Sequence, residues 1–402
     1  MKILQLTKKF PFPLKDGEAI AVTYLGKALH DLGAELSLLS MNTSKHPFDI
    51  KTLPADFNHY KNIHLVDIDN RVKVLDAFLN LFSQKSYHIE RFVSPEFEQK
   101  LKQLLQEEDF DIVHLETLYL APYIETIRKY SKAKIAMRSH NVEHEIWKRI
   151  AENTNIGAKK WYLQLLTKRL ENFEVSNLNL YDIMVAITER DLVFFKSLGL
   201  KIPAIVAPIG LELKDYPETA SKINNNNDFS FIGSLDWMPN IEGLKWLLDL
   251  VWPKVIEKAP EARFHIAGRN TPDWLKELNR PGVIVHGEVP DAVAFICEHQ
   301  TMLVPLLSGS GMRVKILEGM AMGRLVISTD LGLEGIPASG GREVLVANKA
   351  DAFAEAILYA YHHPKAVTEM GNAARTFIHD HFDNKHIAKK VLNAYKNLCH
   401  KV

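Results

Sequence analysis

The sequence predicts an α/β protein made of two tandem, doubly wound parallel-sheet domains. One observation is its length of 402 residues, because a single hydrophobic core rarely serves more than about 300 residues. Another is the alternation of short apolar runs with amphipathic stretches, which is typical of parallel strands covered by helices. This alternation stops near residues 208–227 and then starts again. We therefore expect ligands to bind at the carboxyl ends of the strands, in a central cleft that the two domains face.

The first domain is predicted to span residues 1–207. It opens with a strand at Lys2–Leu6 and a helix at Ala19–Leu32 that ends near Gly33. Further apolar runs predict strands at Ala34–Ser40, Ile63–Ile68, Asp111–Leu115, Ala133–Arg138, Ile183–Ile187 and Ala204–Ala207. Helical periodicity between them predicts helices at Pro95–Gln106, Leu120–Tyr130 and Lys159–Asn177.

A polar stretch at 208–227, punctuated by Pro208, Gly210 and Pro217 and ending in four asparagines, predicts a linker. The second domain is then predicted at 228–383, followed by a terminal helical segment at 384–402. Its strands are expected at Phe229–Ile232, Arg263–Ala267, Val283–His286, Thr301–Val304 and Leu325–Ser328. Its helices are expected at Pro239–Glu257 and Val314–Met322, and three helical runs close the chain at Asp351–Tyr361, Lys365–Asp380 and Lys385–Leu398.

The composition excludes several classes of protein. Lys plus Arg and Asp plus Glu both number 49, whereas a dedicated nucleic-acid binder needs surplus positive charge. Cys297 and Cys399 form no CxxC pair, so we expect reduced thiols. The first residues do not resemble a signal peptide, and no segment approaches the roughly 18 apolar residues of a membrane span. We expect a cytoplasmic protein whose membrane contact, if it has any, is peripheral at the inner face.

The most informative motif runs from Ser308 to Gly323 and follows a predicted strand. Gly309 and Gly311 let the backbone approach a ligand, and a helix N-terminus preceded by glycines is a natural anion site. Arg313 and Lys315 place positive charge where the helix dipole is already positive, which a bound diphosphate would make favourable. The alternative is an ordinary helix in which Lys315 pairs with Glu318.

Glu318 lies on the same predicted helix among apolar neighbours. A carboxylate there is costly unless a donor satisfies it. The two adjacent hydroxyls of a ribose would do so, and the Lys315 ion pair is the alternative.

These residues resemble the donor site of glycosyltransferase family 4, the group 1 glycosyltransferases. The similarity lies in Gly309–Gly323 with Val326–Thr329 and Gly332–Ile336, and in three further stretches that keep the family's order along nearly the whole chain. Those stretches are Phe231–Asn240, Phe264–Gly268 and Pro208–Gly210.

The resemblance implies the GT-B fold and a retaining, metal-independent hexosyltransferase with no cofactor. Its donor would be a nucleotide diphosphate-sugar of the UDP or GDP type, its acceptor a glycan or lipid-linked molecule, and its setting polysaccharide or glycolipid assembly. The N-terminal domain would take the acceptor, the C-terminal domain would hold the donor, and the terminal helix would return to the N-terminal domain. The donor-binding residues would be Gly17, Gly233, Ser234, Gly268, Arg269, Gly309, Ser310, Gly311, Met312, Arg313, Lys315 and Glu318. Arg313, Lys315 and His140 would be catalytic, since cations and amides can stabilise a leaving diphosphate.

The sequence departs from the family at several donor positions. Ser310 stands where the family often has a first glutamate that faces the donor sugar. The sequence therefore does not predict which sugar is transferred. Ser234 and Asn240 stand where the family has an arginine and a lysine, and we infer that Arg313 and Lys315 supply the missing charge. The loop around Gly17 has one glycine where many relatives have two.

The N-terminal domain offers fewer candidate residues. His140 follows the predicted strand Ala133–Arg138 and resembles the family histidine that contacts the donor sugar, the alternative being a helix cap. His114 and Glu116 follow the preceding strand and are weaker candidates for acceptor contact. No GxGxxG follows the first strand of either domain, which disfavours a nicotinamide dehydrogenase.

No metal site is expected. His140 and His144 lack the HExxH order, Asp67–Asp69 ends a strand of the first domain, and the histidines near residues 379–386 have no tight ligand spacing. The aromatic and basic helix near Asn155–Asn177 suits contact with an anionic membrane, the alternative being a partly buried helix with a charged face. Two other functions stay open: a non-catalytic nucleotide-sugar-binding protein and a GT-B sugar-nucleotide epimerase.

Overall fold

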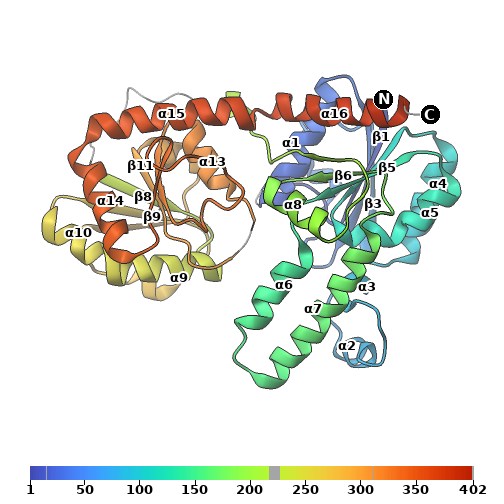
Figure 1. Cartoon of the computed structure of the whole chain (residues 1–402), viewed down its shortest axis with the longest axis horizontal. Helices are drawn as coiled ribbons and strands as arrows, with labels where there is room; N and C mark the ends of the chain where they lie inside the picture. The colour runs from blue at the N-terminus through green and yellow to red at the C-terminus, as the bar shows by residue number, and fades with distance from the viewer. Residues whose placement is uncertain (15, 217–226, 310, 401–402) are drawn as a thin grey trace. The chain divides into compact units, whose positions relative to one another are not determined.

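The chain folds into two compact α/β units, each described separately below (Figure 1). The computed structural model describes residues 1–14, 16–216, 227–309 and 311–400. Unit 1 comprises Met1–Gly210 and Asn384–Val402, and unit 2 comprises Leu211–Asp383. Of the predicted linker, Pro208–Gly210 lies in unit 1 and Leu211–Tyr216 in unit 2, while residues 217–226 lie outside the described ranges.

Unit 1 is built on a parallel sheet of seven strands in the order β3-β2-β1-β4-β5-β6-β7. The strands are β1 Lys2–Thr7, β2 Glu35–Thr43, β3 Asn62–Ile68, β4 Ile112–Glu116, β5 Lys134–Ser139, β6 Ile183–Ala186 and β7 Ala204–Val206. The central strands β1 and β4 are almost completely buried, as expected for a parallel sheet covered by helices on both faces.

Helices flank this sheet on both sides (Figure 1). They are α1 Gly17–Asp31, α2 Val74–Asn80, α3 Tyr87–Glu90, α4 Pro95–Glu107, α5 Ile124–Tyr130, α6 Glu143–Glu152, α7 Gly157–Asn177, α8 Glu189–Ser197 and α16 Asn384–His400. Short 3₁₀ segments lie at Ile50–Thr52 and Leu118–Tyr123. Local chemistry sets the helix starts: the Asp16 carboxylate accepts from the amide of Ala19 at 3.0 Å, and Ser94 caps α4 just before Pro95.

Unit 2 contains a parallel sheet of six strands in the order β10-β9-β8-β11-β12-β13. The strands are β8 Asp228–Ile232, β9 Arg263–Ala267, β10 Val283–Gly287, β11 Thr301–Val304, β12 Leu325–Ser328 and β13 Val344–Val346. The helices are α9 Met238–Trp246, α10 Trp252–Lys258, α11 Asp273–Lys276, α12 Ala292–Cys297, α13 Val314–Ala321, α14 Ala350–His362 and α15 Pro364–Phe382, and a 3₁₀ segment lies at Leu213–Asp215. Every recorded strand pairing in both sheets is parallel. The predicted fold class is therefore confirmed.

Two predicted helices are interrupted at prolines. The helix expected at Pro239–Glu257 is α9 and α10 joined by a π-helical turn at Leu247–Val251, because Pro253 has no N–H to donate to the carbonyl of residue 249. The helix expected from Leu120 begins as the 3₁₀ segment that contains Pro122 and becomes α-helical only at Ile124. The sequence did not predict β13, α6 or α8.

The last helix, α16, belongs to unit 1. Its buried residues Ile387, Val391, Leu392 and Tyr395 join the apolar cluster that lies under α1 and β2. The Asn384 amide donates to the carbonyl of Tyr24 at 2.6 Å, which fixes the start of α16 against α1.

Candidate active site

The candidate residues of unit 1 lie at the carboxyl ends of neighbouring strands. The strand order reverses direction between β1 and β4, which is the position where doubly wound sheets bind ligands. Thr7 ends β1 in register with Glu116 at the end of β4, and Glu116 is in register with Arg138 on β5. Side chains from these strand ends therefore meet at one edge of the sheet.

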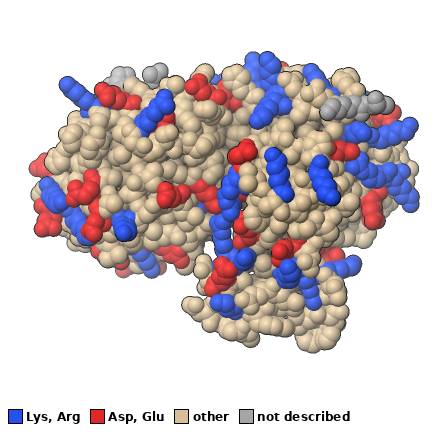
Figure 2. All heavy atoms as spheres, in the orientation of Figure 1, with Lys and Arg blue, Asp and Glu red and all other residues tan. Residues whose placement is uncertain are grey.

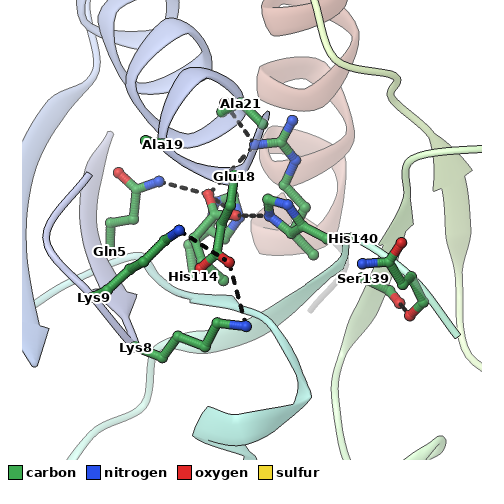
Figure 3. Close-up of polar contacts among 12 residues, drawn as sticks. Gln5, Lys8, Lys9, Glu18, Ala19, Ala21, His114, Ser139 and His140 are labelled. Carbon is green, nitrogen blue, oxygen red and sulfur yellow. Dashed lines mark hydrogen bonds and ion pairs between the residues drawn. The ribbon is translucent and has the colours of Figure 1, made fainter. Parts of the chain in front are cut away.

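Glu116 lies at the centre of a buried polar network, whose members Gln5, His114 and His140 are labelled in Figure 3. Its carboxylate accepts from the Gln5 amide at 2.6 Å and lies 2.6 Å from Nε2 of His140. The Arg138 guanidinium lies 3.5 Å away and also donates to the carbonyl of Ala21. Burial would raise the pKa of Glu116, but Arg138, His114 and His140 together hold it well below its usual value. Glu116 is therefore an ionised carboxylate that orients the His140 ring.

The expected acceptor contact of His114 and Glu116 is not supported by their positions. Both residues have no exposed surface, so neither presents an atom to an outside molecule. Burial lowers the pKa of His114 to about 4, and its ring contacts the Tyr395 hydroxyl of α16 at 3.1 Å. These residues support the site from beneath, and His140 is the member of the network nearest its surface, with 7% of its side chain exposed.

A second charged cluster, which the sequence analysis missed, follows β1. Lys8 lies 3.3 Å from Glu18, and Lys9 lies 2.8 Å from Asp16 and 3.7 Å from Glu18 (Figure 3). Burial would raise the pKa of Glu18, but Lys8 and Lys9 hold it below its usual value. Gly17 lies between these two acids as the first residue of α1. Two lysines directly after the first strand were the signal available in the sequence.

The loop after β5 leads into α6, whose start is held by α7. Glu174 is buried and accepts from the backbone amides of Glu143 and His144, each at 3.1 Å, and contacts the His144 ring at 2.6 Å. Burial raises the pKa of Glu143 to about 7 even though Lys8 lies nearby. His140 therefore does not cap α6, because Glu174 does.

Thr117, directly after Glu116, has an unusual backbone conformation. Its φ of 99° lies where a threonine is strained. Such outliers cluster at functional sites, and this one lies at the switch point of the sheet.

In unit 2, the glycine-rich segment also lies at a switch point, between β8 and β11. Gly309 and Gly311 adopt φ values of 104° and 85°, which an L side chain rarely takes. A Cβ on Gly309 would lie 2.9 Å from Nη2 of Arg313, so this glycine leaves room for the arginine. The Gly311 amide donates to the Glu334 carboxylate at 3.2 Å. Ser310 lies outside the described residues, and Met312 lies between Gly311 and the start of α13.

Glu318 lies within α13 and is 7% exposed. Its carboxylate pairs with Lys315 at 2.8 Å and accepts from the Tyr216 hydroxyl at 3.2 Å. The ion pair that the sequence left as an alternative is therefore present. A carboxylate held by two donors is satisfied, and it has further lone pairs for hydroxyl donors.

The remaining predicted donor residues lie at the ends of β8 and β9. A Cβ on Gly268 would come within 1.9 Å of the Gly233 carbonyl oxygen, so this position requires glycine. Ser234 donates to Asp236 at 2.6 Å, and the Asn240 side chain donates to the Ser234 carbonyl at 2.8 Å. Arg269 follows Gly268, and its carbonyl accepts from the amide of Leu235 at 2.8 Å. Ser234 and Asn240 thus order the turn after β8 and add no positive charge.

Known proteins resemble this chain in the sequence of its second unit and in its fold. Residues 226–363 match the family model described as Glycosyl transferases group 1. Sucrose-phosphate synthase from Thermosynechococcus elongatus has a TM-score of 0.69 at 15% identity, with 99% of each chain covered. Anabaena HepE in complex with UDP has a TM-score of 0.69 at 15% identity, covering 99% of this chain and 100% of HepE. Most of unit 2 is therefore similar to a group 1 glycosyltransferase domain, and the chain has the GT-B fold.

Two further relatives extend the comparison. A glycosyltransferase from Rickettsia africae has a TM-score of 0.66 at 18% identity, covering 100% of this chain and 99% of that structure. An uncharacterised 44.6 kDa protein in the cps region of Klebsiella pneumoniae is 23% identical over 304 residues, which are 73% of this chain and 76% of the relative.

The predicted residues fall into two groups on this GT-B fold. Unit 2 brings Gly233, Ser234, Gly268 and Arg269 to the ends of β8 and β9, and the Gly309–Glu318 stretch to the segment after β11. Unit 1 places Gly17 at the start of α1 and His140 directly after β5. Within the described ranges, no three His, Cys, Asp or Glu side chains are grouped so that they could hold a metal ion. No helix among the described residues combines the length and apolarity that crossing a bilayer requires.

Proposed function

We propose that the chain is a retaining, metal-independent glycosyltransferase of family 4. Its donor would be a nucleotide diphosphate-sugar of the UDP or GDP type, and its acceptor a glycan or a lipid-linked molecule. The observation that carries this proposal is the stretch from Gly309 to Glu318. It joins positive-φ glycines, two cations and a buried carboxylate paired with Lys315 at the switch point of unit 2.

Each part of that stretch suits one part of a sugar nucleotide. Arg313 and Lys315 are donors for a diphosphate, and such charge-assisted hydrogen bonds are short and strong. The Gly311 amide would join them by exchanging the Glu334 carboxylate for a phosphate oxygen. Lys315 would give up part of its pairing with Glu318 to reach the diphosphate. Glu318 would then accept from the ribose hydroxyls while Tyr216 keeps its contact at 3.2 Å.

Catalysis would depend on the same cations. When the bond from the sugar to the diphosphate breaks, negative charge develops on the leaving group, and preorganised donors stabilise it. Arg313 and Lys315 would supply that stabilisation without a divalent metal. His140, oriented by Glu116 at 2.6 Å, would contact the transferred sugar.

Two of the similar proteins support a nucleotide-sugar as the substrate and polysaccharide assembly as the setting. The Anabaena HepE structures contain UDP or UDP-glucose, and the Klebsiella relative belongs to a cps region. We propose that this chain also uses a nucleotide-sugar, in polysaccharide or glycolipid assembly at the inner face of the membrane.

A ligand screen followed by a transfer assay tests the proposal. The unfolding temperature is measured with UDP, GDP and their sugars, since a ligand that binds only the folded state raises it. The stabilising donors are then incubated with acceptor panels in EDTA, and the anomeric configuration of the product is read by NMR. The proposal expects transfer with retention in EDTA. Failure of every nucleotide to bind, binding without transfer, or donor isomerisation without an acceptor would each overturn it, the last two in favour of a sensor or an epimerase.

A further inference from the structure

Two buried tyrosine hydroxyls lie at the outer ends of the polar network around Glu116. The hydroxyl of Tyr395, on α16, lies 3.1 Å from Nδ1 of His114. The hydroxyl of Tyr60, in the segment just before β3, donates to Oε1 of Gln5 at 2.7 Å. Both His114 and Gln5 contact Glu116, so each tyrosine reaches that carboxylate through another side chain.

The two ring nitrogens of His114 face different groups. Nδ1 faces the Tyr395 hydroxyl, and the buried Nε2 lies 3.3 Å from Oε1 of Glu116. Burial lowers the pKa of His114 to about 4, so its ring carries one proton at neutral pH. A proton on Nε2 is attracted by the nearby carboxylate, whereas a lone pair there is repelled by it. His114 is therefore protonated on Nε2, and its Nδ1 is an acceptor.

The Tyr395 hydroxyl supports the same assignment. Within the described ranges, Nδ1 of His114 is its only hydrogen-bond partner. A buried hydroxyl that donates to nothing costs free energy. Tyr395 thus donates to Nδ1 and opposes the tautomer in which that nitrogen carries the proton. Hydrogens then point in one direction, from Tyr395 to His114 and from His114 to Glu116.

Gln5 is oriented in a similar way. Its Oε1 accepts from Tyr60, so its Nε2 faces Oε1 of Glu116 at 2.6 Å. Turning the amide over would place its oxygen against the carboxylate. Gln5 and His114 therefore both present N–H groups to Oε1 of Glu116, which leaves Oε2 for Nε2 of His140 at 2.6 Å.

The network is shielded from solvent. Lys, Arg, Asp and Glu side chains are scattered over the face of the molecule drawn in Figure 2, whereas Glu116 and Arg138 are almost completely buried. Hydrogen bonds in such surroundings are stronger than in water, and an unpaired group there is costly. Water therefore does not replace a donor that a substitution removes from this network.

We propose that Tyr395 is a positioning residue for His140 and acts through His114 and Glu116. The last helix of the chain thereby helps to set the orientation of a ring that follows β5. With its Nε2–H held by Glu116, a neutral His140 turns an acceptor, Nδ1, away from the network. The role of this ring in sugar transfer rests on the proposed function, whereas its orientation can be measured without a substrate.

NMR of the histidine rings in the ¹⁵N-labelled full chain tests the orientation. In the wild type at neutral pH, His114 should show a protonated Nε2 and an unprotonated Nδ1. Tyr395→Phe removes the donor to Nδ1, so the ring signals of His114 should shift and those of His140 should shift with them. The two rings are assigned by the signals that disappear in His114→Gln and His140→Ala.

Tyr123→Phe is the matched control. It removes another buried hydroxyl of unit 1, which donates to the carbonyl of Phe92 at 2.7 Å, and it should leave both rings unchanged. A proton on Nδ1 of His114 in the wild type would overturn the proposal. Ring signals of His140 that do not respond to Tyr395→Phe would overturn it as well.

Kinetics connect the ring to transfer. Tyr395→Phe should lower kcat about three- to tenfold, the change that one ordinary hydrogen bond corresponds to, with little change in donor KM. Combined with His140→Ala it should add little further loss, because both changes act through the same ring. Losses that multiply would contradict the positioning role. Ring signals that behave as expected in a protein without transfer activity would support the positioning and contradict only the proposed function.

Discussion

The His140 ring lies 2.6 Å from the buried carboxylate of Glu116, which is the last residue of the neighbouring strand β4. Arg138, in register with Glu116 on β5, keeps that carboxylate ionised at 3.5 Å. A fixed anion behind an imidazole sets which ring nitrogen carries the proton and which way the ring faces. Glu116 is therefore a positioning residue for His140.

Glu116→Gln tests this role without removing the side chain. We expect kcat to fall about 10- to 100-fold with little change in donor KM, because ring orientation is lost while the donor residues of unit 2 are untouched. Combining it with His140→Ala should add little further loss, since both changes act through the same ring. Losses that multiply would show that Glu116 acts independently of His140.

Glu116→Ala should behave differently because it leaves a charge without its partner. Arg138 is 1% exposed, and removing one member of a buried ion pair costs about 3–5 kcal/mol of unfolding free energy. Urea unfolding of the variant and the wild type measures this difference. A loss below about 1 kcal/mol would mean that Arg138 finds water or another acceptor.

Glu143 predicts a pH dependence of stability. Its pKa rises from 4.5 to about 7 on folding because it is buried, so the folded state binds the proton more tightly than the unfolded state. The resulting stabilisation is complete below the unfolded pKa and is lost as pH rises through the folded pKa. Between pH 4.5 and 7, wild-type stability should fall relative to Glu143→Gln by about 3 kcal/mol. Taking the difference between the two proteins cancels the histidines that titrate in the same window, and a constant difference would contradict the prediction.

Gly268→Ala should destabilise unit 2 by about 2–3 kcal/mol. Its Cβ would lie 1.9 Å from the Gly233 carbonyl oxygen, and a backbone atom cannot rotate away as a side chain can. The matched control is Gly157→Ala, whose Cβ would have no neighbour within 4 Å. Thermal unfolding should separate the two variants clearly, and equal unfolding temperatures would mean that the two strand ends can move apart.

The sequence predicted the strands well because parallel strands buried on both faces are short apolar runs. It failed where tertiary contacts decide the structure. The three residues of β13 form a strand only because β12 lies beside them, and the start of α6 depends on Glu174, about 30 residues later in the chain. Pro122 and Pro253 are helix breakers that can be seen in the sequence, and both interrupt segments whose apolar periodicity predicts a continuous helix.

In the candidate site, too, local sequence motifs could be predicted, whereas features that depend on tertiary contacts could not. The glycines before α13 and its cations could be identified from their order in the chain, because the motif is local. The burial of Glu116 and His114 could not, since a carboxylate at a strand end is usually solvated. Burial here depends on Gln5, Arg138 and Tyr395, which come from three separate elements. The strand register could have indicated this burial. Opposite charges in register near the ends of adjacent strands, such as Glu116 and Arg138, predict a buried ion pair.

Calorimetric titration of UDP and GDP into the wild type and into Arg313→Ala with Lys315→Ala tests the central claim most directly. Lys276→Ala on α11 removes a cation from another part of unit 2 as the control. The account predicts that the preferred nucleotide binds the wild type and the control equally, and that the double variant loses at least about 100-fold in affinity, since each charge-assisted hydrogen bond contributes about 1.5–3 kcal/mol. Unchanged affinity in the double variant would show that the diphosphate binds elsewhere, and the site built on the start of α13 would have to be abandoned.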